Sequence, residues 1–288
     1  MNNNFFVKSH GLGNDYIVMD GRKVDFEFTV KNIQLICDVH YGIGSDGILV
    51  LVGSSRAEFG LRILNPDGSE AEKSGNGLRI FAKFLFDCGY TAKTSFSIDT
   101  LGGVVQAEII EKDKGKARMI KVDMGSAIFE SEKIPVKSEN AECLDEVLEL
   151  DGTSYLIDCV SVGNPHCVVI KDELSVDEIM KYGSQIENHP KFPNRINVQF
   201  AKVLSPELVE ILIWERGAGW TLASGSSSSA VAAIMVKKGL TERKLTLKMP
   251  GGELKLQIDE DWQIHMTGEV REICSGVLSD ELLRELGA

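Results

Sequence analysis

The chain has 288 residues, enough for two domains of ordinary size that each bury a core. Its 31 basic and 43 acidic residues give a net charge of −12, and no stretch is basic enough to neutralise a phosphate backbone, so we expect no nucleic-acid partner. No apolar segment reaches the roughly 18 residues that cross a bilayer, and residues 1–4 lack the features of a signal peptide, so we expect no membrane partner and a cytoplasmic location.

Short alternating or apolar runs predict strands along most of the chain. In chain order they are Ala57–Leu64, Phe96–Thr100, Val104–Ile110, Met119–Met124, Tyr155–Val162, Asn197–Val203 and Leu245–Ile258. Two glycine pairs, Gly102-Gly103 and Gly251-Gly252, have strand-like residues on both sides and predict two hairpins.

Five segments predict helices. Gly77–Cys88 and Ser229–Lys238 are apolar on nearly all sides, which is typical of helices buried within a core. Lys31–Val39, Val176–Tyr182 and Asp280–Leu286 are amphipathic, so we expect them on the outside. Each half of the chain is therefore predicted to be a sheet curled around one central helix.

The six cysteines have neither a C-x-x-C motif nor metal-ligand spacing. We interpret them as reduced thiols, mostly buried in packing positions, and expect no metal site. Polar residues cluster in Ser126–Asp151, where we place a linker. The expected domains are residues 1–125 and 126–275, with the tail 276–288 packing back on the first.

The two halves resemble each other at a constant offset. Gly13-Asn14 and Gly163-Asn164, Ser74-Gly75 and Ser224-Gly225, and Gly89 and Gly239 are each separated by 150 positions. A constant offset over several landmarks indicates an internal repeat. The predicted fold is therefore α+β, with two pseudo-symmetric domains, each a mostly antiparallel sheet around a central helix, and two half-sites that face each other.

Each half has a Ser-Gly corner that begins its central helix, Ser74–Gly77 in the first half and Ser224–Ser227 in the second. The unpaired N–H groups at such a helix start favour an anion. If both starts point at one ligand, they can hold one carboxylate and stabilise the charge that appears when the adjacent α-proton leaves. An acid and a base on opposite sides of that carbon would invert it, and the hydroxyls of Ser74 and Ser224 stand where these groups should be.

Several longer motifs resemble those of the diaminopimelate epimerase family. They are Gly11–Tyr16, Asn65–Glu72, Ser74–Gly77, Gly163–His166 and Trp214–Gly219, in order along nearly the whole chain. The resemblance implies two similar domains, a homodimer, no pyridoxal phosphate or metal, and inversion of one α-carbon of diaminopimelate by two cysteines. Together with the helix corners, it implies a set of substrate-binding residues: Asn14, Asn65, Gly75, Asn76, Asn164, Asn197, Glu215, Arg216, Gly225 and Ser226.

The chain departs from the family pattern at the two catalytic positions, where Ser74 and Ser224 replace cysteine. A hydroxyl is a far weaker acid than a thiol, and the sequence reveals no base beside either serine, so we expect substrate binding with little or no turnover. Deliberate replacement of both cysteines to trap a bound ligand is our first hypothesis, and a natural non-enzymatic relative is the second. Ser227, in place of a usual glycine, and Trp220, in place of a polar residue, also depart from the pattern.

Other functions remain open at this point. A racemase of another amino acid, such as histidine, shares the fold and the cysteine pair, and Trp220 favours it by offering a ring for stacking. Packing between the two halves would explain a tryptophan at position 220 equally well. A purely binding or regulatory protein, and an isomerase of a substrate that is not an amino acid, are further alternatives. A serine hydrolase is disfavoured because neither corner has the G-x-S-x-G pattern.

Overall fold

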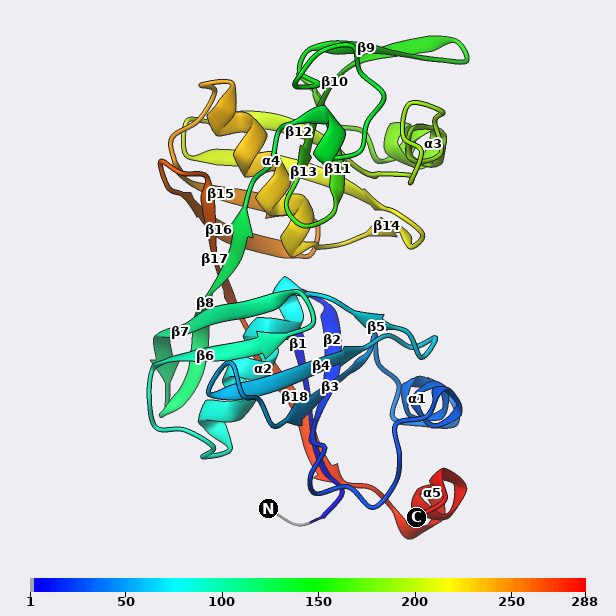
Figure 1. The fold of residues 1–288 in the computed structure, drawn as a ribbon, viewed down its shortest axis with the longest axis vertical. Coiled ribbons are helices and arrows are strands. Elements are labelled where there is room, and N and C mark those ends of the chain that lie inside the picture. The colour runs from blue at the N-terminus through cyan, green and yellow to red at the C-terminus, as the bar shows by residue number, and fades with distance from the viewer. Residues whose placement is uncertain (1–2) are drawn as a thin grey trace. The chain divides into compact units, whose positions relative to one another are not determined.

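The computed structural model describes residues 3–288. The chain forms two compact units, unit 1 with residues Met1–Val122 and Gly268–Ala288, and unit 2 with Asp123–Thr267. It passes from one unit to the other twice, within strand β8 (Lys116–Ser126) and within strand β17 (Gln263–Glu269). Figure 1 shows both units as sheets with helices, and each is described separately below.

Unit 1 is a mixed, mostly antiparallel sheet. Besides β8, its strands are β1 (Phe5–Gly11), β2 (Asn14–Asp20), β3 (Ile48–Val52), β4 (Phe59–Leu64), β5 (Glu70–Ala71), β6 (Ser95–Thr100), β7 (Gly103–Asp113) and β18 (Arg271–Val277). The pairings β2–β3 and β4–β6 are parallel. The pairings β1–β2, β1–β18, β3–β4, β4–β5, β6–β7 and β7–β8 are antiparallel. Each parallel pair is joined through a helix, as a parallel connection requires.

Unit 2 repeats this order of pairings. Besides β17, its strands are β9 (Glu146–Leu150), β10 (Thr153–Ser161), β11 (Pro165–Ile170), β12 (Asn197–Ser205), β13 (Leu208–Glu215), β14 (Gly219–Thr221), β15 (Lys244–Met249) and β16 (Gly252–Ile258). The parallel pairs are β11–β12 and β13–β15, which stand where β2–β3 and β4–β6 stand in unit 1. The α+β fold with two similar, mostly antiparallel halves is confirmed.

A buried helix lies against the sheet of each unit. Helix α2 (Gly75–Asp87) contacts β1, β2 and β7, and helix α4 (Gly225–Lys237) contacts β10, β11, β12, β15 and β16. Residues 78–85 of α2 and 227–235 of α4 are buried without interruption. Apolar residues on all sides thus place both helices in the core, as predicted.

The remaining helices are α1 (Val30–Cys37), α3 (Val176–Glu187) and α5 (Asp280–Leu286), with a 3-10 turn η1 at Ser131–Lys133. Helix α1 buries Ile33 and Ile36, and Leu286 of α5 belongs to the same apolar cluster in unit 1. None of the helices within residues 3–288 is long and apolar enough to cross a membrane. The predicted helices are found, with α2 and α4 each beginning at the Ser-Gly corner itself.

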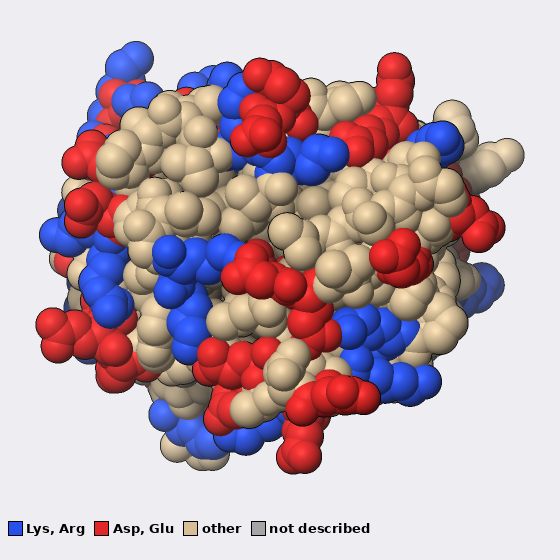
Figure 2. Space-filling model, turned by 90° about the horizontal axis from the view of Figure 1, so that it is seen from above, with Lys and Arg blue, Asp and Glu red and all other residues tan. Residues whose placement is uncertain are grey.

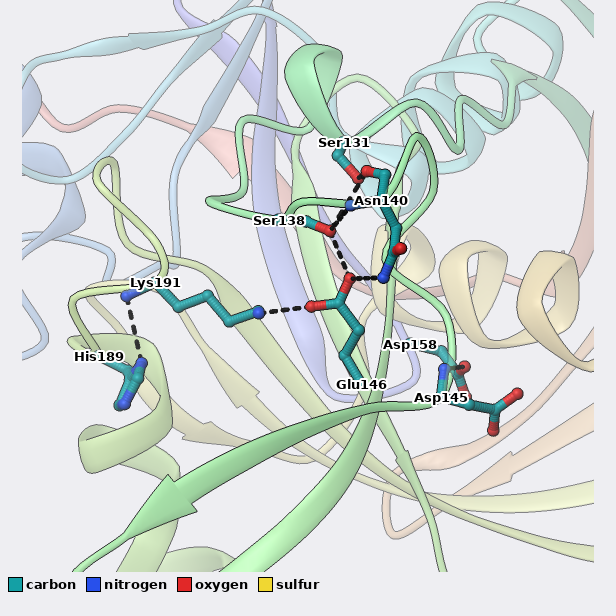
Figure 3. A network of polar contacts seen from close by, with 8 residues as sticks. All are labelled: Ser131, Ser138, Asn140, Asp145, Glu146, Asp158, His189 and Lys191. Carbon is teal, nitrogen blue, oxygen red and sulfur yellow. Dashed lines mark hydrogen bonds and ion pairs between the residues drawn. The ribbon is translucent and has the colours of Figure 1, made fainter.

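The segment Ser126–Asp151, expected to be a linker, lies almost entirely in folded parts of unit 2 and contains η1 and β9. Its polar residues alternate with buried ones, including Ile134, Val136 and Leu148. Figure 3 shows how it is anchored: Glu146 accepts hydrogen bonds from Ser138 and Asn140 and forms an ion pair of 2.5 Å with Lys191. Because apolar side chains between its exposed charges are buried, the segment is a folded part of unit 2 and not a linker. The divisions between the compact units fall after residue 122 and after residue 267, three and eight residues before the expected ones.

Acidic and basic side chains are intermixed on the surface. Figure 2 shows both signs side by side over the face in view. Many of them form ion pairs between half-exposed side chains, such as Arg56–Asp99 at 2.6 Å and Arg62–Glu70 at 2.8 Å. Exposed pairs of this kind contribute little to stability, typically below about 1 kcal/mol each.

Candidate active site

The first Ser-Gly corner is built by the N-cap of α2. Ser74 has extended backbone angles, and its Oγ accepts the N–H of Gly77 at 3.0 Å. The phenol oxygen of Tyr16, on β2, lies 3.3 Å from the same Oγ. Since the first three N–H groups of a helix have no acceptor within it, this cap leaves those of Gly75 and Asn76 to face a ligand.

The side chains beside this corner form a hydrogen-bonded chain that runs from the fully buried Arg79 to the exposed Asp46. Asn76 donates to Oδ1 of Asn14 at 3.1 Å, and Asn14 donates to Asp46 at 2.8 Å. The fully buried Arg79 donates to Oδ1 of Asn76 at 2.7 Å. Burial lowers the pKa of the Arg79 guanidinium to about 10, so it stays charged at neutral pH. The structure thus brings Asn14, Ser74 and Asn76 together and fixes the amide of Asn76 with a buried cation.

Asn65 occupies the turn after β4. Its side chain donates to Oγ of Ser69 at 2.9 Å, and its backbone N–H donates to the Ser69 carbonyl at 2.8 Å. These bonds are local to the turn between β4 and β5. The amide is half-buried, and its role in holding a substrate stays a prediction.

The second corner is the N-cap of α4. Ser224, 5% exposed, accepts the N–H of Ser227 at 3.3 Å, and its Oγ lies 3.4 Å from that of Ser226. Its side chain also hydrogen-bonds with the carboxylate of Glu215, the last residue of β13. Burial raises the pKa of the Glu215 carboxyl, and the bond with Ser224 opposes that rise. A carboxylate therefore stands beside this serine, contrary to the expectation that neither serine has a base beside it.

Near the second corner lie further polar side chains, of which His166, Gln199 and Ser227 are fully buried. His166 contacts Oδ1 of Asn164 through Nε2 at 2.9 Å, and Gln199 donates to Oγ of Ser227 at 3.0 Å. Burial lowers the pKa of His166 to about 3, so the ring is neutral, and a hydrogen bond with Gln199 opposes this shift. Ser227, which departs from the family pattern, is thus accommodated by an amide that faces it.

Asn197 and Arg216 meet at the end of β13. The side chain of Asn197 accepts the backbone N–H of Arg216 at 2.9 Å and donates to the carbonyl of Pro165 at 2.8 Å. Buried Glu187, at the end of α3, holds the neighbouring backbone by accepting the N–H of Gly217 at 2.9 Å. These contacts fix the segment from which the Arg216 side chain extends, and its guanidinium donates to the carbonyl of Asn194 at 3.1 Å.

A serine N-cap does not by itself indicate catalysis. Thr29, Ser175 and Ser279 cap α1, α3 and α5 with the same type of hydrogen bond. The corners at Ser74 and Ser224 differ because each lies at the start of a buried helix, beside a second functional group, Tyr16 in one unit and Glu215 in the other. The two serine caps of buried helices, at matched positions 150 residues apart, mark the candidate site.

Comparison with known proteins agrees with the repeated architecture. The family model described as diaminopimelate epimerase matches residues 6–130 and 158–273. Diaminopimelate epimerase 2 of Nostoc sp. is 48% identical over 278 residues, which are 96% of this chain and 96% of the relative. Diaminopimelate epimerase of Acetivibrio thermocellus is 41% identical and covers 94% of this chain and 97% of the relative. The chain belongs to the diaminopimelate epimerase family.

Solved structures share the fold of this family member at low sequence identity. A hydroxyproline epimerase from Agrobacterium vitis, with bound trans-4-hydroxy-L-proline, superposes with a TM-score of 0.71 at 15% identity, covering 95% of this chain and 90% of its own. A PhzF-family phenazine biosynthesis protein from Bacillus anthracis gives 0.69 at 16% identity, covering 97% of this chain and all of its own. These likenesses concern the fold alone.

Four residues that frame the site of this epimerase-family chain escaped the sequence-based prediction: Tyr16, Arg79, Glu187 and Gln199. The sequence alone contained an indication for two of them, Tyr16 and Arg79. The offset of 150 pairs Tyr16 with His166, and Arg79 is a charge between the apolar residues Leu78 and Ile80 of a predicted core helix. Glu187 and Gln199 contact the site only through the fold.

Three other features of the family member can now be placed. Trp220 of β14 pairs with Trp214 and packs against the apolar core of unit 2. Within the described part of the chain all six cysteines are free thiols, of which Cys37, Cys143, Cys159 and Cys167 are buried. No group of three or more His, Cys, Asp or Glu residues in residues 3–288 has the arrangement of a metal site.

Proposed function

We propose that this chain has the site for interconverting LL- and meso-diaminopimelate by two-base inversion of one stereocentre, and that Ser74 and Ser224, in place of the two catalytic cysteines, leave it with little or no turnover. Family membership supports the reaction, and the relatives named above are diaminopimelate epimerases. The observation that carries the proposal is the duplicated corner, a hydroxyl at the start of a buried helix in each unit. With thiols at these two positions, one group would take the proton from one face of the α-carbon and the other would deliver a proton to the opposite face.

The proposed site uses only groups of the chain, with no cofactor or metal. The N–H groups of Gly75, Asn76, Gly225 and Ser226 receive the α-carboxylate, whose negative charge grows as the proton leaves. The distal amino acid group is assigned to Asn65, Asn164, Asn197 and Arg216, because amides donate and accept and a guanidinium binds a carboxylate with two hydrogen bonds. Asn14 lies beside the reacting carbon, and Glu215 receives the substrate ammonium.

Restoring the thiols tests the proposed function. A thiol ionises near neutral pH at a helix start and a hydroxyl does not, so S74C/S224C is expected to exchange the α-proton of LL-diaminopimelate with solvent deuterium at least ~100-fold faster than the unaltered chain. Exchange is followed by mass spectrometry in heavy water. S74A/S224A is the matched control and should not exchange.

Two results would contradict the proposal. If S74C/S224C shows no exchange while it still binds the ligand, the chain is a binding protein. If S74C/S224C exchanges the α-proton of histidine faster than that of diaminopimelate, the chain is a racemase of another amino acid. Either result leaves the fold and the family unchanged.

We also propose a homodimer. Strand β18 pairs with β1, and Ile273, Ser275 and Val277 alternate along it, with Ile273 52% and Val277 49% exposed. An exposed apolar strand face of this kind is typical of a contact with another chain. Sedimentation at micromolar concentration is expected to give twice the 31.6 kDa chain mass, and I273K is expected to give monomers. A monomer at all concentrations would disprove the dimer.

The cytoplasm is the proposed location. The described chain keeps six free cysteines, and free thiols persist in a reducing compartment. Fractionation of cells that express the protein should recover it with cytoplasmic markers, and recovery with an extracytoplasmic fraction would contradict this.

A further inference from the structure

We propose that Arg79 and Asp46 are positioning residues of the first corner. Between them lie Asn76 and Asn14, and the two charged groups turn both amides so that each presents an N–H group to the substrate carboxylate at the reacting centre. The inference rests on the proposed function and deepens it, because it explains how this corner recognises a carboxylate. The two charged residues act through the asparagines that lie between them.

The start of the parallel pair β2–β3 places Asp46 beside Asn14. Ile17 of β2 pairs with Ile48 of β3, so Asn14, the first residue of β2, comes level with the segment just before β3. There the Asp46 carboxylate accepts the side-chain N–H of Asn14 at 2.8 Å and the backbone N–H of Asp15 at 3.0 Å. Two hydrogen bonds thus hold the carboxylate at the start of β2.

Arg79 is held at the other end by close packing. It follows Asn76 by three residues on α2 and donates to Oδ1 of Asn76 at 2.7 Å. Gly11, opposite Asn14 in the β1–β2 pairing, makes room for it, since a Cβ there would lie 3.2 Å from Nη2 of Arg79. The guanidinium is fully buried, and its pKa of about 10, lowered by burial, keeps it charged at neutral pH.

The two charged ends fix which way each amide faces. A guanidinium only donates hydrogen bonds, and an ionised carboxylate only accepts them. Arg79 therefore meets the oxygen of the Asn76 amide. The nitrogen of Asn76 donates to the oxygen of Asn14 at 3.1 Å, and the nitrogen of Asn14 donates to Asp46. A neutral amide at either end could donate or accept, and would leave this direction open.

The fixed direction leaves donors for a ligand. An amide nitrogen carries two hydrogens. Within residues 3–288 the side-chain nitrogens of Asn76 and Asn14 each donate one hydrogen bond, so a second N–H of each remains. Together with the N–H groups at the start of α2, they suit a carboxylate, which only accepts. A carboxamide would place hydrogens of its own against them.

The second corner is built from different residues. The offset of 150 puts Ser229 at the position of Arg79, and the Ser229 hydroxyl donates to the carbonyl of Gly225 at 2.8 Å. It puts Ile196 at the position of Asp46. Neither side chain carries a charge, so orientation of amides by two charged ends belongs to the first unit.

D46N tests the positioning by the sign of its effect. Because little or no turnover is expected, the dissociation constant of LL-diaminopimelate with the unaltered chain can be measured by titration calorimetry. Loss of a negative charge near a bound carboxylate would by itself tighten binding. An amide at this position can also donate, so Asn14 is no longer held, and D46N is expected to weaken binding by ~10-fold. Equal or tighter binding would overturn the inference.

N14A shows whether Asp46 acts through Asn14. In the N14A chain the hydrogen bond between them is already lost, so adding D46N should weaken binding by less than ~2-fold. The same ~10-fold loss in both backgrounds would mean that D46N disturbs the site in a general way, and would overturn the inference.

The buried end is tested by comparing R79K with R79Q. A lysine only donates, whereas a glutamine also accepts. R79K should therefore bind within ~3-fold of the unaltered chain, and R79Q should bind ~10-fold or more weakly. Equal losses would overturn the role of Arg79. If R79Q does not fold, D46N and N14A decide, because the side chains of Asp46 and Asn14 lie outside the core.

R56Q is the matched control. Arg56 also forms an ion pair in unit 1, with Asp99 at 2.6 Å, but its side chain is 60% exposed, so R56Q should change the dissociation constant by less than ~2-fold. Two failures are distinguishable. If the unaltered chain binds no LL-diaminopimelate, the proposed function fails and this inference with it. If the unaltered chain binds and D46N binds equally well, only the inference fails.

Discussion

Replacing Lys83 with methionine is expected to lower the free energy of unfolding by about 3–5 kcal/mol, because it leaves a buried carboxylate without its cation. Lys83 and Asp87 lie one turn apart on α2, with side chains 8% and 5% exposed and a separation of 2.8 Å. Lys83 also donates to the carbonyl of Ala117 at 2.5 Å, and Asp87 accepts the Ala117 N–H at 2.8 Å. The pair therefore fixes α2 to β8, and urea denaturation of the variant measures the loss.

Two further variants control this prediction. K83M/D87N removes both charges and keeps the acceptor for the Ala117 N–H, so it should be more stable than K83M alone. K116M removes an exposed cation whose ion pair with Glu272 spans 2.8 Å, and should cost no more than about 1 kcal/mol. Equal stability of K83M and K116M would show that burial of the Lys83–Asp87 pair has no energetic consequence.

Acid is expected to destabilise the protein through His166. Burial lowers its pKa to about 3, whereas an unfolded histidine titrates near 6.5. Above pH 6.5 the ring is neutral in both the folded and the unfolded chain. It then adds nothing to the pH dependence of the free energy of unfolding. Between about 6.5 and 3 the unfolded chain binds a proton that the folded chain does not, so the free energy of unfolding falls as the pH falls, by up to about 1.4 kcal/mol per unit.

H166Q isolates this contribution, since it removes the titrating ring and keeps a polar side chain for Asn164. From pH 8 to pH 5 the unaltered protein should lose about 2 kcal/mol more of its unfolding free energy than H166Q does. Denaturation curves at both pH values give the difference. An equal loss in the two proteins would mean that His166 binds a proton in the folded state as readily as in the unfolded state.

Much of the fold was predictable because the sequence patterns that indicate its helices and hairpins are local or occur in both halves. The apolar stretches that became α2 and α4 and the hairpin at Gly251-Gly252 follow from periodicity and glycine placement. The edge of unit 2 was not predictable. Ile134, Val136 and Leu148 are spaced among charges, so only the tertiary structure shows that they are buried.

Prediction of the site was limited by contacts between distant residues. The motifs identified Ser74, Asn76 and Asn14, which the structure brings together. Glu215 was named for its chemistry, yet its contact with Ser224, nine residues further along the chain, follows only from the tertiary structure. Arg79 lies within one turn of Asn76 on α2, so their bond is local, and only the tertiary structure shows that this cation is fully buried.

The two passages of the chain between the units bear on how the protein is synthesised. Unit 2 is one continuous segment, so all of it has emerged from the ribosome once residue 267 is clear of the exit tunnel. Unit 1 begins first and is completed last, because β1 pairs with β18 and Asn32 donates to the carbonyl of Leu286 at 2.9 Å. The pairing of β1 with β2 can form early, whereas its pairing with β18 must wait for the last part of the chain. Unit 2, although synthesised second, is therefore the first unit whose chain is complete.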